Sequence, residues 1–306
     1  MLWPPRVAVV TGANRGLGLS LAECLAESGT HVVLAARDEQ LCTAAATALA
    51  SAKGVSVEAV QLDVQCGRSI EVFGAYCERT FGGIDLLVNN AAVCEAGWSE
   101  AVVRRALRTN VLGPRALTRR LLPALRQQPH GQVLHVSSGD GELLYLNPEL
   151  QRQMAAVDSE RTLLCGKAEL RPAGSPGAPF SARSCSRLPR ASVSLGHSAV
   201  WPASMRAGHI GPVSHLAGTL LRLLAAARPP CSAFGDAPAY GASPAYALSK
   251  AALNALTRVQ AAAAPGVWVG AACPGDVLTR RALCRKQVRY GLGMAGVWPR
   301  YGLGMA

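Results

Sequence analysis

Two side chains four residues apart, Tyr246 and Lys250, form the pair best suited to proton transfer. They lie in an Ala-rich stretch expected to be helical, where residues four apart share one face. A free phenol has a pKa of about 10, and a nearby ammonium group favours the phenolate and lowers that pKa. The pair therefore predicts a tyrosine that exchanges a proton with a carbonyl or alcohol oxygen. A chance pair on an exposed helix face is the alternative.

A glycine-rich segment, Thr11–Gly18 (TGANRGLG), lies between a predicted strand and a predicted helix. Glycines let the backbone approach a ligand closely, and the unpaired N–H groups at a helix N-terminus attract phosphate. Placed within a β-α-β unit, this pattern predicts a turn that binds the pyrophosphate of a dinucleotide. A tight turn without a ligand is the alternative.

Arg37 ends the second predicted strand, where NAD-binding folds usually carry an acid that binds the ribose 2′-hydroxyl. A guanidinium pairs instead with a 2′-phosphate, and Arg15 can reach the same group. We therefore expect NADP(H) as the cofactor, with a solvated surface arginine beside Asp38 as the alternative. Ser138 follows the fifth predicted strand, where a hydroxyl can hydrogen-bond a substrate carbonyl.

The elements that must position these groups alternate between strand and helix. Predicted strands are Val7–Val10, His31–Ala36, Val55–Leu62, Ile84–Val88, Gln132–Ser137 and Val267–Ala272. A long helix is expected within Glu100–Arg126, and an Ala-rich helix over residues 245–263. This order predicts an α/β fold with a doubly wound parallel sheet and helices on both faces. Ligands of such sheets bind beyond the carboxyl ends of the strands.

Charge is divided unevenly along the 306 residues, of which 50% are hydrophobic and 16% charged. Residues 1–169 hold 17 acids and 16 bases (−1), whereas residues 170–306 hold 2 acids and 15 bases (+13). The basic half has scattered arginines and little aromatic interleaving, so we expect no nucleic-acid-binding module. Nucleic-acid binding stays a third hypothesis, which predicts salt-sensitive retention that is lost on deleting residues 166–235.

Neither a secretory signal nor a long apolar run is recognised, so we expect a cytoplasmic protein without a membrane span. The ten cysteines form no Cys-x-x-Cys pair and have no histidine at zinc-ligand spacing. The sequence thus predicts no metal site.

Taken together, these residues resemble the short-chain dehydrogenase/reductase family. The family's motifs occur in order over residues 6–165 and 236–280: Thr11–Gly18, Asp63, Asn89-Asn90-Ala91-Ala92, Asn110, Ser138, Tyr246–Lys250 and Pro274-Gly275. The chain is most similar to the NADPH-dependent carbonyl reductases, which share Asn-Arg in the glycine motif, Ala-Arg-Asp after the second strand, and an extra helical segment before the tyrosine, here Glu142–Leu164. The resemblance implies a Rossmann-type fold.

The resemblance also implies a role for each matching residue. Cofactor contacts are implied for Gly12, Asn14, Arg15, Gly16, Leu17 and Gly18 at the pyrophosphate, Arg37 at the 2′-phosphate, Asp63 and Val64 at the adenine, Asn90, Tyr246 and Lys250 at the ribose region, and Pro274, Gly275, Val277 and Thr279 at the nicotinamide end. Tyr246 is implied as the acid, Ser138 as its carbonyl-polarising partner and Lys250 as the group that lowers the tyrosine pKa. Asn110 is implied to hold a water of the proton relay.

Three departures from the family pattern stand out. Ala92 replaces the usual glycine, and 108 residues separate Ser138 from Tyr246. The excess coincides with an irregular Arg/Ser/Pro/Gly-rich insertion, residues 166–235, for which a retained intron is our hypothesis. Where the family continues with a substrate-covering helix and a last sheet strand, Arg280–Ala306 offers only a basic stretch and a repeat. We expect one domain over residues 1–280, interrupted by this insertion, and a disordered tail over 281–306 that repeats Arg-Tyr-Gly-Leu-Gly-Met-Ala.

The leading hypothesis is an NADPH-dependent reductase of small-molecule aldehydes, ketones or quinones. A catalytically impaired NADP-binding relative with a disrupted substrate side is the alternative. The extra segment before Tyr246 lies where many relatives pair their helices, so the resemblance favours a monomer.

Overall fold

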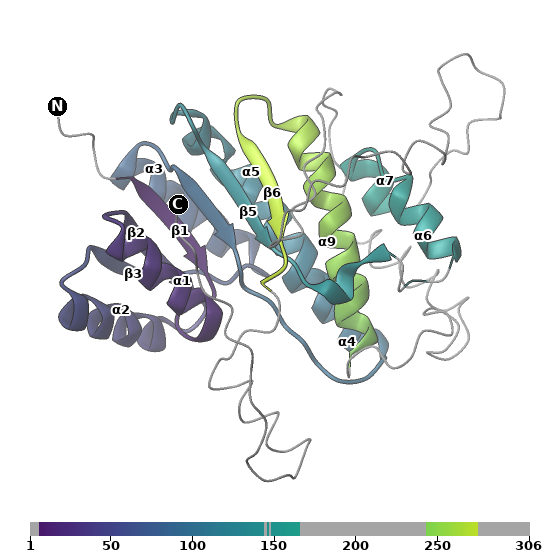
Figure 1. Ribbon diagram of the computed structural model, residues 1–306, viewed down its shortest axis with the longest axis horizontal. Coiled ribbons are helices and arrows are strands. Elements are labelled where there is room, and N and C mark those ends of the chain that lie inside the picture. The colour runs from purple at the N-terminus through teal and green to yellow at the C-terminus, as the bar shows by residue number, and fades with distance from the viewer. Residues whose placement is uncertain (1–5, 144–145, 147, 166–242, 275–306) are drawn as a thin grey trace, which may run out of the picture. The chain divides into compact units, whose positions relative to one another are not determined.

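The computed structural model describes residues 6–143, 146, 148–165 and 243–274, all within the first of the two units into which the chain divides, Met1–Gly275. The strands are β1 Val7–Thr11, β2 His31–Ala36, β3 Val57–Gln61, β4 Leu86–Asn89, β5 Gln132–Val136 and β6 Trp268–Ala272 (Figure 1). The helices are α1 Gly16–Glu27, α2 Glu39–Lys53, α3 Gly67–Phe81, α4 Glu100–Leu107, the π-helical turn η1 Arg108–Leu112, α5 Gly113–Arg126, the 3₁₀ turn η2 Gly139–Gly141, α6 Pro148–Ala155, α7 Glu160–Cys165 and α9 Pro244–Ala263. The predicted insertion, residues 166–235, and the predicted tail, residues 281–306, lie outside the described residues.

The described strands form a sheet in the order β3-β2-β1-β4-β5-β6, and every neighbouring pair is parallel. The predicted doubly wound, Rossmann-type parallel sheet is therefore confirmed. The strand order reverses at β1, which pairs with β2 on one side and β4 on the other. In such sheets the crevice beyond the carboxyl ends at this reversal is where ligands bind.

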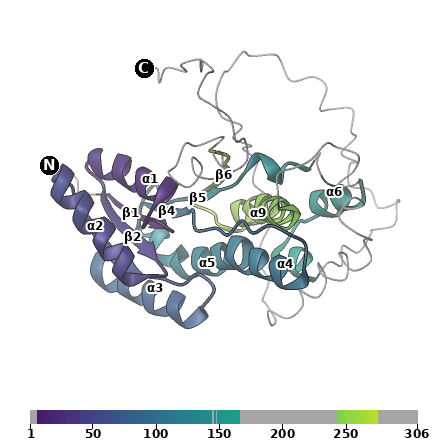
Figure 2. The ribbon, with the colours of Figure 1, turned by 90° about the horizontal axis from the view of Figure 1, so that it is seen from below.

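Alternate residues of the strands feed two separate hydrophobic clusters. In β1, Val7 and Val9 pack in the cluster that faces α3 and α5, whereas Ala8 and Val10 pack in the cluster that faces α1 and α2. Figure 2 shows the sheet between α1 on one side and α3 and α5 on the other. Both faces of the sheet are covered, which explains why its strands read as continuous apolar runs in the sequence.

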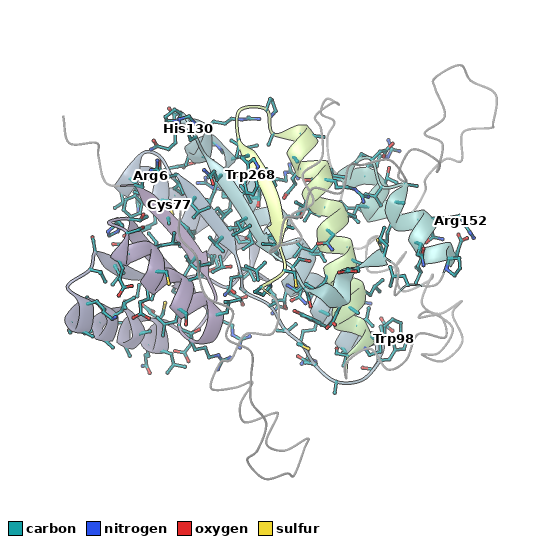
Figure 3. The ribbon with its side chains drawn as sticks, in the orientation of Figure 1. Arg6, Cys77, Trp98, His130, Arg152 and Trp268 are labelled. Atoms are coloured by element: carbon teal, nitrogen blue, oxygen red, sulfur yellow. The ribbon has the colours of Figure 1, made fainter. Side chains whose placement is uncertain are left out.

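A third cluster surrounds α9, the helix that carries Tyr246 and Lys250. It joins residues of α9 such as Leu248 and Leu256 to α4, α6 and α7. The extra helical segment expected over Glu142–Leu164 contains α6 and most of α7, which lie beside α9 in Figure 1. An ion pair of 2.8 Å between Arg115 and Glu160 ties α7 to α5. In Figure 3, Trp98 packs against this cluster, while Trp268 of β6 is exposed.

Some element bounds differ from those expected. The fourth strand begins at Leu86 rather than Ile84, because the Ile84 N–H donates to the carbonyl of Ala124 at the end of α5 instead of to the sheet. The long helix expected within Glu100–Arg126 is split by η1, whose wider turn carries Asn110. Among the described helices, none has both the length and the apolarity that crossing a membrane requires.

Candidate active site

The glycine-rich turn leads from β1 into the N-terminus of α1. Gly12 and Gly16 have φ angles of 66° and 58°, in the left-handed region that favours glycine. The Gly12 N–H donates to the carbonyl of Ala35 at 2.7 Å, which fixes the turn to the end of β2. Arg15 immediately precedes α1, and its side chain does not cap the helix. It therefore accepts no hydrogen bond from the backbone N–H groups in the first turn of α1. The turn thus offers donors that fit a phosphate group.

Asn90 holds this turn from the neighbouring strand. Its Nδ2 donates to the carbonyl of Thr11 at 2.8 Å, and its backbone N–H donates to Thr11 Oγ1 at 3.0 Å. A Cβ atom added at Gly18 would overlap Asn90 Nδ2 and lie 2.6 Å from the Gly12 carbonyl oxygen. Gly18 therefore packs too closely against Gly12 and Asn90 to carry a side chain, which holds the start of α1 against the turn. This structural use of the Asn90 amide was not predicted, and its ribose contact stays a prediction.

The residues predicted to surround the adenosine lie at the carboxyl edge of β1, β2 and β3. Arg15 and Arg37 are both exposed there. Asp38, the neighbour of Arg37, accepts a hydrogen bond from the Leu41 N–H at 3.0 Å and caps α2. Its carboxylate is thus used by the helix. Asp63 accepts from the Gln65 N–H at 2.9 Å.

Further residues of the predicted cofactor set differ in exposure. Val64 is buried, and its carbonyl would lie 2.9 Å from a Cβ atom at Gly113, so the chain passes close to the start of α5. Asn14 and Leu17 are half-buried in the turn. Pro274 is exposed just after β6. Gly275, Val277 and Thr279 lie outside the described residues, so their nicotinamide contacts stay predictions.

Ser138, Tyr246 and Lys250 meet at the same edge of the sheet. Ser138 follows β5 and caps η2, where its Oγ accepts from the Asp140 N–H at 3.2 Å. Tyr246 lies in the first turn of α9, and Lys250 Nζ lies 5.4 Å from the centroid of its ring. Lys250 Nζ also donates to the carbonyl of Val136, the last residue of β5, at 2.6 Å. The fold thus brings together groups that are 108 residues apart in the sequence.

The electrostatics of this site differ from the expectation. Burial raises the pKa of Tyr246 to about 12, and a hydrogen bond with the Ser138 side chain partly offsets that rise. Burial lowers the pKa of Lys250 to about 8. Burial therefore outweighs the lowering that was expected for the Tyr246 pKa, and the role of Lys250 in lowering it stays a prediction. Tyr246 holds its proton at neutral pH, as a proton donor must.

Asn110 sits in the π-helical turn η1 and joins the segment after β4 to α9. Its Nδ2 donates to the Val93 carbonyl and to Ser249 Oγ, both at 2.9 Å, and its Oδ1 accepts from the Val93 N–H at 2.9 Å. Ser249 in turn donates to the Tyr246 carbonyl at 2.7 Å. Both amide donors of Asn110 are thereby used. Its predicted contact with a relay water stays a prediction.

Two polar residues near the site were missed by the sequence analysis. Ser249 connects Asn110 to the helix, and Asn254 contacts the segment around Ser138. Asn254 follows Lys250 by four residues, the same spacing that singled out Tyr246. Extending that helical face by one turn would have found Asn254. No comparable signal marks Ser249, whose partner lies 139 residues away.

Comparison with known proteins agrees with this geometry. Residues 6–147 match the family model described as short chain dehydrogenase. This match confirms the predicted resemblance to the short-chain dehydrogenase/reductase family over that part of the chain.

Within that family, the matched part is most like the carbonyl reductases. It is 40% identical over 139 residues to "Carbonyl reductase [NADPH] 3" of Homo sapiens, covering 44% of this chain and 49% of that protein. It is 36% identical over 155 residues to "Carbonyl reductase [NADPH] 1" of Sus scrofa, covering 48% and 53%. The chain thus spans about half the length of the curated relatives it matches. The structure of salutaridine reductase from Papaver somniferum shares the fold, with a TM-score of 0.65 and 23% identity over 90% of this chain and 88% of that one.

Proposed function

We propose that the chain is an NADPH-dependent reductase that transfers a hydride to the carbonyl carbon of a small aldehyde, ketone or quinone. The observation that carries the proposal is the meeting of Ser138, Tyr246 and Lys250 at the carboxyl edge of the sheet, the same edge at which the glycine-rich turn follows β1. Relatives named carbonyl reductase [NADPH] support the reaction class.

NADP(H) is the cofactor we propose. Two exposed guanidinium groups, Arg15 and Arg37, lie at the edge where the 2′-phosphate would be bound, and the neighbouring Asp38 carboxylate is used by α2. The tight turn that Gly12 and Gly18 allow leads directly into the α1 N-terminus, where a pyrophosphate would be bound. When bound, NADPH supplies the hydride. Lys250, whose amine lies beside the Tyr246 ring, would bind the ribose of the cofactor.

The chain's own residues handle the proton. Tyr246 is protonated at neutral pH, so it can donate its proton to the carbonyl oxygen as negative charge develops there. Ser138, already hydrogen-bonded to Tyr246, would hold the same oxygen and orient the carbonyl. Burial lowers the pKa of Lys250 to about 8, so that this amine can gain or lose a proton close to the working pH.

A second candidate, binding of NADP(H) without catalysis, is favoured by one observation. A phenol whose pKa is raised to about 12 by burial is a weak acid, and proton donors work best when their pKa lies near the working pH. If no bound group lowers this pKa, the site binds the cofactor and turns over slowly or not at all.

A screen of carbonyl compounds for NADPH oxidation by the full chain tests the proposal. We expect carbonyl-dependent loss of NADPH absorbance. Tyr246→Phe should lower kcat at least about 100-fold, while the dissociation constant of NADPH changes less than about twofold. Full activity of that variant contradicts the mechanism, and cofactor binding without turnover favours the second candidate. A version lacking residues 166–235 tests in parallel whether the insertion obstructs the substrate side.

Oligomeric state and location are also proposals. Helices α6 and α7 pack against α9 and cover part of its surface, which supports a monomer, to be checked by light scattering. A cytoplasmic location is proposed from the sequence and can be checked by fractionation.

A further inference from the structure

Asn254 occupies the same face of α9 as Tyr246 and Lys250, one turn further along. Its amide bonds the segment that follows β5 at two points. Asn254 Oδ1 accepts from Ser137 Oγ at 2.6 Å, and Asn254 Nδ2 donates to the carbonyl of Gly141 at 3.1 Å. These two contacts lie on either side of Ser138, so the amide holds both ends of the turn that presents the Ser138 hydroxyl.

The turn is also pressed against the backbone of α9. A Cβ atom added at Gly141 would lie 2.7 Å from the carbonyl carbon of Lys250 and 3.0 Å from the Ala251 nitrogen. Within the turn, the Gly141 N–H donates to the Ser138 carbonyl at 3.0 Å. The turn therefore has little freedom to shift along the helix, provided that its ends stay attached.

We propose that Asn254 is a positioning residue, which fixes the turn carrying Ser138 against α9 so that the Ser138 hydroxyl meets Tyr246. Its kinetic consequences rest on the proposed reductase function. The structural part of the proposal does not.

Side-chain chemistry explains why an amide suits this position. The Gly141 carbonyl can only accept a hydrogen bond, and Ser137 uses its hydroxyl proton as a donor, so the joining group must donate at one end and accept at the other. Aspartate would keep the acceptor but lose the donor, and alanine would lose both. Ser137 is buried and committed to Asn254, which leaves Ser138 as the serine that faces Tyr246.

Gln260 provides a matched control. Its side chain is a buried amide on α9, the helix that also carries Asn254, and its Oε1 lies 2.9 Å from Nε2 of His135 on β5. It lies ten residues beyond Lys250, away from η2. Removing its amide disturbs the contact between β5 and α9 without touching the turn.

The experiment compares full-length Asn254→Ala, Asn254→Asp and Gln260→Ala with the unmodified chain. We expect backbone amide exchange over residues 137–142 to become at least about tenfold faster in Asn254→Ala and to stay unchanged in Gln260→Ala. With an active substrate, kcat should fall about tenfold or more in Asn254→Ala, while KM for NADPH changes less than about twofold. Alcohol oxidation, which needs the phenolate, should reach half its maximal rate at a higher pH, because the bond with Ser138 lowers the pKa of Tyr246.

Equal exchange over residues 137–142 in the Asn254 and Gln260 variants overturns the proposal, as does an unchanged kcat and pH profile in an active Asn254→Ala. If the unmodified chain reduces no carbonyl compound, the reductase function fails, and the exchange measurement still decides the positioning role. Should Asn254→Ala not fold, Asn254→Asp answers the question, because it keeps the bond from Ser137 and loses the bond to Gly141.

Discussion

The glycine-rich turn and the Ser138–Tyr246 region both place groups at the carboxyl edge of the sheet, but they are built differently. The turn, residues 11–18, is contiguous and is shaped by backbone, with φ angles of 66° at Gly12 and 58° at Gly16. The second region joins β5 and η2 to α9, segments more than 100 residues apart in the sequence. Side chains make that junction, through Lys250, Asn254 and Gln260.

This difference determines what each region tolerates. A tightly packed backbone turn is disrupted when an added side chain has no room. A junction of polar side chains is disrupted when one partner is removed and the other is left without a hydrogen bond. We therefore expect side chains added in the turn to weaken cofactor binding, and loss of polar groups at the junction between β5 and α9 to lower turnover or stability. Four predictions, two for the cofactor region and two for the region of β5 and α9, test this comparison.

The largest expected effect is that of Ser138→Ala on turnover. Losing this hydroxyl removes the bond to Tyr246 and the group proposed to hold the substrate oxygen, which should lower kcat about 100-fold. The dissociation constant of NADPH should change less than about twofold, since Ser138 is outside the turn. Steady-state kinetics and fluorescence titration measure both. Ser28→Ala, at an exposed hydroxyl after α1, is the control. A comparable loss of NADPH binding would show that the two regions are not separable.

Gly18→Ala should act mainly on NADPH binding, unlike Ser138→Ala, which should act mainly on kcat. The added methyl group would lie 2.6 Å from the Gly12 carbonyl and overlap Asn90 Nδ2, so the turn must shift. We expect a loss of about 2 kcal/mol in the free energy of unfolding and weaker NADPH binding, despite the better helix propensity of alanine.

Gly67→Ala is the matched control for that substitution, because a Cβ atom there meets nothing within 4 Å. It should leave stability and binding almost unchanged or slightly improved. Normal NADPH affinity in Gly18→Ala would contradict the claim that close packing at Gly18 maintains the cofactor-binding turn.

The contiguous region was also the easier one to predict. The strand His31–Ala36 was predicted with its observed bounds, and the turn was placed correctly between β1 and α1. Local sequence carries that information, because apolar runs, glycines and helix starts act over a few residues. Tyr246 and Lys250 were found because one helical turn relates them.

The side-chain junction was not predictable in the same way. The hydrogen bonds from Asn110 to Ser249 and from Ser137 to Asn254 span 139 and 117 residues, so no local pattern reveals them. The pKa of Tyr246 was expected to fall because of Lys250, but burial, which only the folded chain establishes, raises it.

Arg37→Ala tests whether the exposed guanidinium of Arg37 binds the 2′-phosphate of NADPH. Removing this guanidinium should weaken NADPH binding about tenfold and leave NADH binding unchanged, because only NADPH carries the 2′-phosphate. Isothermal titration measures the two affinities. Arg126→Ala, an exposed arginine at the end of α5 that leads into the amino end of β5, is the control. A parallel loss for both nucleotides would place Arg37 elsewhere on the cofactor.

The smallest expected effect concerns His135, which belongs to the junction between β5 and α9. Burial lowers the pKa of His135 from 6.5 to about 4. The unfolded chain, with the ordinary pKa, therefore binds more protons between pH 6.5 and pH 4, so stability falls as the pH drops through that window. Between pH 7.5 and pH 5.5 the loss from this residue is about 1 kcal/mol. His135→Gln should reduce the drop in Tm over that range by about 2–4 °C, and His130→Gln, at the exposed imidazole labelled in Figure 3, should not. An identical drop in the His135 variant would mean that water reaches this imidazole, and that the junction is not the dry, side-chain-held contact that sets it apart from the glycine-rich turn.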